Sequence, residues 1–267
     1  NAAPVLAQLE FLLAAVWPEL KVAVTSVTEQ WAGMAISGPR SREVLAAVLE
    51  GIDMSNDAFP FMGVRRGSLE GVPVLVARLS FSGELAYEVY CGAHHGEAIW
   101  TRLRAAGAPF GIVPDGIEAP GALRIEKGHL AGPELDGRTT AADLGLESMT
   151  SLRNHYIGSA MLHREGLIDP DRLKLVAFVS TDGGKIRAGA HLVDPADVAR
   201  PPRSLGHVTS VTYSPALETY IALGLLEDGS NRMGQRLTAT YPLKNIDVAV
   251  AVISPHFYAP EGRRRHA

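Results

Sequence analysis

In the first 130 residues, the spacing of the apolar positions changes repeatedly between that of a helix and that of a strand. Apolar residues at helical spacing predict helices over 2–16, 40–50, 94–107 and 115–128. Apolar runs with a two-residue period predict strands over 21–28, 31–37, 63–69, 72–81 and 86–91, the third and fourth joined by a hairpin turn at Glu70-Gly71. We expect this region to combine antiparallel strands with flanking helices.

Glycines mark the expected ends of two of these helices. The helix over 94–107 is predicted to end at Gly107, and the helix over 115–128 at Gly128, each with a left-handed cap. Pro120 must then lie near the first turn of the second helix, where its missing N–H group costs no hydrogen bond.

The pattern changes after residue 129. Gly, Pro, Asp and Thr interrupt the sequence from 129 to 170, which predicts a loop-rich connector with one short helix over 158–165. Beyond it only strands are indicated, over 173–180, 205–213, 220–226, 235–241 and 246–252. Short strands at this spacing favour a small antiparallel barrel. The predicted fold class is therefore α+β, with a first domain over 1–165 and a C-terminal β-barrel domain over 166–267.

Composition narrows the class of protein. With 267 residues, 46% of them hydrophobic and 20% charged, the chain is long enough for two cores. A net charge of -4 gives no general attraction to nucleic acid or to an acidic membrane. The longest apolar run is shorter than the roughly 20 residues that span a bilayer. We therefore expect a cytoplasmic protein that has neither nucleic acid nor membrane as a partner.

Several kinds of catalytic site are not supported by the sequence. His94 and His95 near Cys91 lack a second pair of ligands that would complete a metal site, so no metal is predicted. Cys91 is the single cysteine and reads as a small strand residue. The run 181–185 lacks the glycine spacing of a phosphate loop, and no Gly-x-Ser-x-Gly elbow of a serine hydrolase occurs.

Two blocks carry the most informative chemistry. The first surrounds the corner Ser82-Gly83-Glu84, and the second is the helix end at 123–128, which contains Arg124. A carboxylate and a guanidinium from two such elements would hold a flat heterocycle from two sides. The simpler interpretations are an ordinary hairpin turn and a solvated pair of charges.

A longer series of blocks, in a fixed order, makes the pattern specific. It comprises 25–32, Ala35-Ile36-Ser37-Gly38-Pro39, Gly51-Ile52-Asp53-Met54, Ser82-Gly83-Glu84, Leu123-Arg124-Ile125-Glu126-Lys127-Gly128, 136–146, Tyr156-Ile157-Gly158, Leu205-Gly206-His207-Val208-Thr209-Ser210, 213–217 and 221–223. With this series the chain resembles the folate-binding family that includes the glycine cleavage T-protein (aminomethyltransferase) and the C-terminal half of the alpha subunit of heterotetrameric sarcosine oxidase. The similarity is strongest to the sarcosine oxidase member.

The resemblance implies a site for tetrahydrofolate. Its pterin ring would be held by Glu88 and Arg124, with the ring of Phe81 and the neighbouring Tyr87 beside it. Alternatives remain for both charged residues: Glu88 as a solvent-facing strand residue, and Arg124 as the ion-pair partner of Glu126 or Glu118. No catalytic residue is assigned.

The resemblance also implies a reaction. In a sarcosine-oxidase-like parent, the one-carbon unit from oxidative demethylation of sarcosine or a related N-methyl amine would be captured on tetrahydrofolate as 5,10-methylenetetrahydrofolate. Flavin and NAD are expected only on other parts of the parent complex, whose subunits would be partners. Alternatives are a T-protein-like aminomethyltransferase and a non-catalytic folate-binding or scaffold module.

Two departures from the family affect these expectations. The chain begins with Asn1, and the family segment that supplies a functional aspartate has no counterpart in it, so we expect a piece of a longer protein. Phe81 stands where the T-protein has tyrosine, which leaves an aromatic surface without a hydroxyl group.

Overall fold

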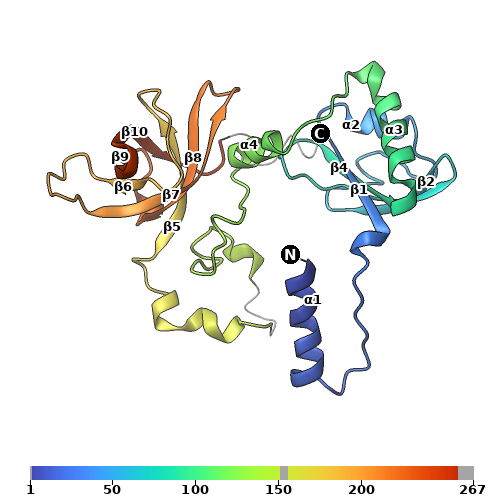
Figure 1. Ribbon diagram of the computed structural model, residues 1–267, viewed down its shortest axis with the longest axis horizontal. Helices are drawn as coiled ribbons and strands as arrows, with labels where there is room; N and C mark the ends of the chain where they lie inside the picture. Colours follow the sequence, from blue (N-terminus) through green and yellow to red (C-terminus); the bar gives the residue numbers. More distant parts are fainter. Residues whose placement is uncertain (1, 151–155, 258–267) are drawn as a thin grey trace. The chain divides into compact units, whose positions relative to one another are not determined.

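The computed structural model describes residues 2–150 and 156–257, which form two compact units (Figure 1). The first, here called the sheet unit, contains residues 2–80 and 84–114. The second, the barrel unit, contains 115–257 together with the short corner 81–83. The helix with Arg124 and the connector after it therefore have most of their contacts with the barrel.

The sheet unit is built on a four-stranded antiparallel sheet. Its strands are β1 (Trp31–Ser37), β2 (Val64–Leu69), β3 (Val72–Ala77) and β4 (Ala86–Gly92), in the order β1-β4-β3-β2. Glu70 and Gly71 join β2 to β3 with φ angles of 51° and 79°. Positive φ at both central residues suits the twist of a tight hairpin, so the predicted turn is confirmed.

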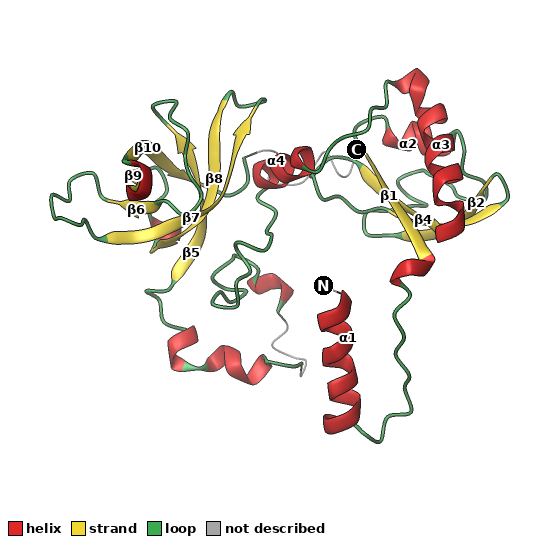
Figure 2. Cartoon of the chain, viewed as in Figure 1, coloured by secondary structure: helices red, strands yellow, loops and turns green. Residues whose placement is uncertain are grey.

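Helices cover one face of this sheet. Helices α2 (Ser41–Ala46) and α3 (Gly96–Gly107) contribute Val44, Leu45, Ile99 and Leu103 to a core with Ile36, Val76, Tyr87, Val89 and Cys91 (Figure 2). Side chains alternate between the two faces of a strand, so Glu88 and Tyr90 lie on the opposite side. We call this opposite side the open face, because both residues remain partly exposed there.

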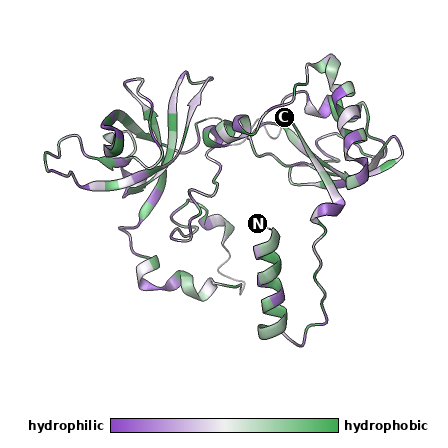
Figure 3. Ribbon diagram, in the orientation of Figure 1, coloured by the Kyte–Doolittle hydropathy of each residue, from purple (hydrophilic) through white to green (hydrophobic). Residues whose placement is uncertain are grey.

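The N-terminal part of the sheet unit differs from the prediction. Helix α1 (Ala2–Phe11), with a π-helical turn at Leu12–Val16, forms as expected, but none of its ten residues is buried, although Figure 3 shows it as largely apolar. The strand predicted over 21–28 is wrong, since residues 21–27 form neither helix nor strand and only a 3-10 turn starts at 28. Val22 is 58% exposed. An apolar run forms a stable strand only where a neighbouring strand pairs with it, and β1 is the edge of this sheet.

The two predicted glycine caps have different outcomes. Gly107 keeps a right-handed conformation, and the chain continues through a 3-10 turn (Ala108–Phe110) to Gly111, whose φ of 76° makes it the left-handed cap. A Cβ atom at Gly107 would lie 2.5 Å from the side chain of Ile112, so glycine is needed there for close packing. Helix α4 (Glu118–Lys127) ends at Gly128 with φ 73°, as predicted.

The barrel unit contains a closed antiparallel barrel. Its strands are β5 (Leu173–Ser180), β6 (His191–Val193), β7 (Ser204–Ser214), β8 (Thr219–Glu227), β9 (Arg236–Tyr241) and β10 (Ile246–Ile253), in the closed order β10-β5-β8-β7-β6-β9. Strand β6 was not predicted because three residues give too short a pattern. The helix predicted over 158–165 appears as two 3-10 turns, Ser159–His163 and Glu165–Leu167. The α+β class with a C-terminal barrel is confirmed.

Helix α4 belongs to the packing of the barrel. Ile125 forms a cluster with Ala177, Ile221 and Leu223 on the outside of β5 and β8. This contact fixes the helix on the barrel and brings the preceding residue, Arg124, against β7.

Candidate functional site

The open face of the sheet carries a carboxylate between very small neighbours. Glu88 is near the middle of β4, and its direct partners in register are Ala35 of β1 and Ala77 of β3. Side chains directly across a strand pair lie close together, so their size decides how much room a central residue has. Ala35 is exposed, whereas Ala77 is buried and only 5% exposed, so the small neighbour that leaves open room beside the Glu88 carboxylate is on the β1 side.

Tyr90 holds this carboxylate from the same strand and the same face. Its hydroxyl group donates a hydrogen bond to Oε2 of Glu88. This bond, followed by burial and by the charge of Glu88, raises the pKa of Tyr90 to about 12. The phenol therefore remains a donor at neutral pH. Within the described ranges no second donor reaches Glu88, so the carboxylate keeps capacity to accept further hydrogen bonds.

The ring of Tyr90 lies over a glycine of the edge strand. Gly33 is its partner in β1, and a Cβ atom there would lie 2.9 Å from Cε1 of the ring. The absence of a side chain at Gly33 therefore makes room for Tyr90 in this position.

Tyr87, the other predicted aromatic of β4, points into the core of the sheet unit. It is fully buried, its ring centroid is 5.7 Å from that of Phe59, and its hydroxyl group accepts a hydrogen bond of 3.2 Å from Nε of Arg42. Its place is thus beneath Glu88, on the opposite face of the same strand.

Arg124 lies in the barrel unit and is 8% exposed. Its Nη1 forms an ion pair of 3.0 Å with Oε2 of Glu134, and its Nη2 donates to Oγ of Ser210 at 2.7 Å. The ion-pair partner is therefore Glu134, and neither of the two glutamates considered from the sequence. One of those, Glu126, accepts a hydrogen bond of 2.5 Å from Ser214.

Glu134 is fully buried and surrounded by donors. Ser210 and Thr209 donate to its Oε1 at 2.5 and 2.6 Å, and the N–H group of Ala131 donates to Oε2 at 2.9 Å. Burial, the largest single influence, raises the pKa of Glu134, but these hydrogen bonds and the charge of Arg124 outweigh it and hold the pKa below its usual value. The sequence contained a signal for this network, because Thr209-Ser210 is part of the ordered series of blocks, but its acidic partner was missed.

The corner residues 81–83 pack beside the end of α4. The ring of Phe81 meets the edge of His129 with centroids 5.0 Å apart, and Phe81 is 47% exposed. Burial, followed by the charge of Arg124, lowers the pKa of His129. The stem of Lys127 lies against Gly83, where a Cβ atom would be 2.6 Å from Cδ. The structure thus places Phe81 in the neighbourhood of Arg124, while Glu88 and Tyr87 belong to the sheet unit.

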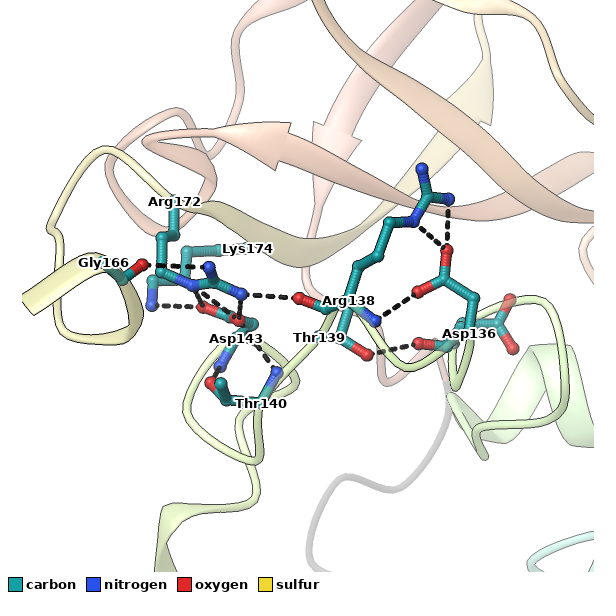
Figure 4. A network of polar contacts seen from close by, with 9 residues as sticks. Asp136, Arg138, Thr139, Thr140, Asp143, Gly166, Arg172 and Lys174 are labelled. Atoms are coloured by element: carbon teal, nitrogen blue, oxygen red, sulfur yellow. Dashed lines mark hydrogen bonds and ion pairs between the residues drawn. The ribbon is translucent and has the colours of Figure 1, made fainter. Parts of the chain in front are cut away.

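A second buried carboxylate joins the connector to the barrel (Figure 4). Asp143 accepts hydrogen bonds from Nη2 of Arg172 at 2.6 Å, Nζ of Lys174 at 3.0 Å and the N–H group of Thr140 at 2.9 Å. Burial raises the pKa of Asp143, but these bonds outweigh it and hold the pKa well below the usual range. Asp143, Arg172, Asp136, Arg138 and His207 line a cleft of about 200 Å³. Asp143 and Arg172 already satisfy each other, so we assign them to the structure of the barrel unit.

The described residues contain neither a candidate metal site nor a helix that could span a membrane. Within 2–150 and 156–257, no group of three or more His, Cys, Asp or Glu side chains is arranged to hold a metal ion. In the same part of the chain, no helix combines the length and the apolar character needed to cross a membrane.

Two family models match the chain. The GCVT N-terminal domain matches residues 1–154, and the glycine cleavage T-protein C-terminal barrel domain matches residues 174–259. The second match covers the strands of the barrel, and the first covers the sheet unit and α4.

Curated relatives agree with these models. The chain is 40% identical over 269 residues to the sarcosine oxidase subunit alpha of Rhizobium meliloti (strain 1021), covering 99% of this chain and 27% of that protein. It is also 40% identical to the same subunit of Corynebacterium sp. (strain U-96), covering 99% of this chain and 28% of that protein. The aminomethyltransferase of Halothermothrix orenii is 30% identical over 220 residues, covering 80% of this chain and 58% of that protein. The chain thus spans little more than a quarter of the sarcosine oxidase subunits that it matches.

A solved structure shows the same fold. The crystal structure of the glycine cleavage system aminomethyltransferase T from Bartonella henselae superimposes with a TM-score of 0.71 at 22% identity, covering 85% of this chain and 59% of that one. The resemblance predicted from the ordered blocks is confirmed. The chain belongs to the glycine cleavage T-protein family and is similar over nearly all its length to part of the sarcosine oxidase alpha subunit.

Proposed function

We propose that this chain is the folate-binding part of an enzyme that transfers one-carbon units. The observation that carries the proposal is Glu88, a carboxylate with spare acceptor capacity on the open face of the sheet, between Ala35 and Ala77. A flat ring with adjacent amino and ring N–H donors suits this arrangement, because the carboxylate accepts both donors while the small, exposed side chain of Ala35 leaves space for the ring.

The expected strength of this contact is appreciable. A hydrogen bond to a charged group contributes about 1.5–3 kcal/mol, provided that water does not replace it equally well. The pterin ring of tetrahydrofolate presents donors of this kind. Arg124, Phe81 and Tyr87 stay predictions as contacts of the ligand, and the packing of Tyr87 in the core favours a supporting role for it.

The reaction we propose is capture of a one-carbon unit. An iminium or formaldehyde unit from oxidative demethylation of sarcosine or a related N-methyl amine would combine with bound tetrahydrofolate to give 5,10-methylenetetrahydrofolate. This chain would contribute by holding the folate in place and by limiting access of water, which raises the effective concentration of the reacting groups.

The oxidation itself would be flavin chemistry on other parts of the parent protein, with NAD also bound there. Other subunits of a sarcosine-oxidase-like complex would be partners, and the cytoplasm the location. The names of the curated relatives support an enzymatic role, and the 40% identity to sarcosine oxidase alpha subunits, against 30% to an aminomethyltransferase, favours this reaction over a T-protein-like aminomethyl transfer.

The proposal is tested by isothermal titration of the chain with 5-formyltetrahydrofolate, a stable reduced folate. We expect the wild type to bind and Glu88→Gln to weaken binding by about tenfold or more, since the amide replaces a charged acceptor. Glu97→Gln is the matched control, because Glu97 is exposed on α3, across the sheet from the open face. Equal affinity of the wild type and Glu88→Gln would show that the pterin ring does not bind through Glu88.

A further inference from the structure

Tyr90 and Glu88 form a pair on the open face that the family resemblance did not indicate. They are two residues apart on β4, so their side chains leave the strand on the same side. The Tyr90 hydroxyl group donates to one carboxylate oxygen, Oε2. This bond restricts the rotation of a side chain that otherwise has several rotamers.

The bond also decides which oxygen is available. Oε2 is engaged by a neutral donor, while Oε1 has no donor among the described residues. A carboxylate fixed in this way presents Oε1, and the remaining lone pair of Oε2, in one orientation. A ligand that binds through two adjacent donors needs such an orientation, because both hydrogen bonds must form together.

The position of Tyr90 depends in turn on the edge strand. Its ring lies across the backbone of β1 at Gly33, and a Cβ atom at that residue would lie 2.9 Å from Cε1 and 3.1 Å from Cδ1 of the ring. Across β3 the partner of Tyr90 is Leu75, which is half-buried. The Tyr90 ring thus lies between Gly33, which has no side chain, and the aliphatic Leu75.

We propose that Tyr90, whose ring packs over Gly33, is the positioning residue that orients the Glu88 carboxylate for a flat heterocycle with adjacent N–H donors. The inference rests on the proposed function, since it concerns the same ligand contact. It assigns Tyr90 no contact with the ligand itself. The raised pKa of Tyr90 is consistent with it, because the group stays a donor throughout the physiological pH range.

The test is a double-mutant cycle on the affinity for 5-formyltetrahydrofolate. Tyr90→Phe keeps the ring and removes the donor, and we expect it to weaken binding about fivefold to tenfold. In Glu88→Ala, which removes the acceptor, adding Tyr90→Phe should change affinity by less than about twofold, because the Tyr90 hydroxyl group then has no carboxylate to position. Tyr213→Phe, on the exposed edge-to-face pair with Tyr220 in the barrel unit, is the matched control and should bind as the wild type does.

Gly33→Ala offers a second route to the same result. The new methyl group must displace the Tyr90 ring, so affinity should fall by a factor similar to that of Tyr90→Phe, and little further when both changes are combined. Gly116→Ala, at a glycine with open space around it and no positive φ, is its control. Independent, multiplying losses from Tyr90→Phe and Glu88→Ala would instead show that the Tyr90 hydroxyl group acts independently of Glu88 and would overturn the inference.

A readout without ligand separates the two proposals. In protein with ¹³C-labelled tyrosine rings, the Cζ resonance of Tyr90 is identified by its absence from the spectrum of Tyr90→Phe. This resonance should shift in Glu88→Gln, because the charged acceptor of the Tyr90 hydroxyl group is replaced. An unchanged resonance would show that Tyr90 does not donate to Glu88 and would overturn the inference. If the wild type binds and Glu88→Gln does not, full affinity of Tyr90→Phe overturns the positioning role alone. If the folded wild type binds no reduced folate, the proposed function fails and the inference fails with it.

Discussion

Glu88 in the sheet unit and Glu134 in the barrel unit are both glutamates held by hydrogen bonds, but they differ in what remains to be bound. Glu134 is fully buried and is reached by two hydroxyl groups, a backbone N–H group and the guanidinium of Arg124. Glu88 is half-buried and, among the described residues, receives one donor from Tyr90. A carboxylate with all its acceptor sites filled stabilises the fold, whereas one with free acceptor sites on an open surface is able to bind a ligand.

The largest effect is expected for Glu134→Ala. Removal of one partner of a buried ion pair leaves the other charge without compensation, which costs about 3–5 kcal/mol. All three tryptophans (Trp17, Trp31 and Trp100) lie in the sheet unit, so their fluorescence reports that unit, and far-UV circular dichroism also follows the barrel. We therefore expect the midpoint of denaturation, followed by circular dichroism, to be lower in Glu134→Ala than in the wild type.

The matched control is Glu165→Ala, an exposed glutamate of the barrel unit, which should unfold as the wild type does. A wild-type midpoint for Glu134→Ala would contradict the structural role of Glu134 and would end the contrast with Glu88.

A smaller effect, dependent on pH, is expected for Asp143→Asn. The amide leaves Arg172 and Lys174 without their carboxylate, at a cost of about 2–4 kcal/mol at neutral pH. The folded pKa of Asp143 lies below its unfolded value, so its contribution is fully present above the unfolded pKa of about 4 and is lost as the pH falls further.

The stability of the wild type should therefore fall below about pH 4, and the difference between wild type and Asp143→Asn should narrow there. Thermal unfolding measured from pH 3 to pH 7, at intervals of about one pH unit, tests this expectation. The control is Asp171→Asn, because Asp171 is exposed. A difference that does not change with pH would show that the charge of Asp143 is not what stabilises the connector.

The smallest effect on stability is expected for Glu88→Gln. The amide oxygen still accepts from Tyr90, and Glu88 has no ion-pair partner in the part of the chain that the structure describes, so the free energy of unfolding should change by less than about 1 kcal/mol. Tryptophan fluorescence during denaturation measures this in the sheet unit. A loss as large as that of Glu134→Ala would mean that Glu88, too, serves the fold.

The sequence predicted most of the fold because it rests on local patterns. The hairpin at Glu70-Gly71 and the cap at Gly128 depend on backbone conformations that few residues adopt, so they were recognised correctly. The strand over 21–28 failed because apolar residues alone do not show whether a pairing partner exists. Gly107 was misread as a cap because its contact with Ile112 is a matter of packing.

The site was less predictable than the fold. Glu88 and Arg124 came from the family resemblance, but the partners that define their surroundings are distant in the sequence. Arg124 meets Ser210 across 86 residues, and no local period records such a contact. The hydrogen bond from Tyr90 is local, and strand periodicity alone would have revealed that it shares a face with Glu88.

The alternation along β4 ties the proposed ligand contact to folding in one respect. Tyr87 and Val89 are fully buried, while Glu88 and Tyr90 lie on the open face. Insertion or deletion of one residue just before this strand would exchange the two sets, placing a charge in the core and an apolar pair in the solvent. If Glu88 contacts the ligand as proposed, specificity can change through substitutions at Glu88 but not through a change of length here, which would destroy the domain together with the proposed site.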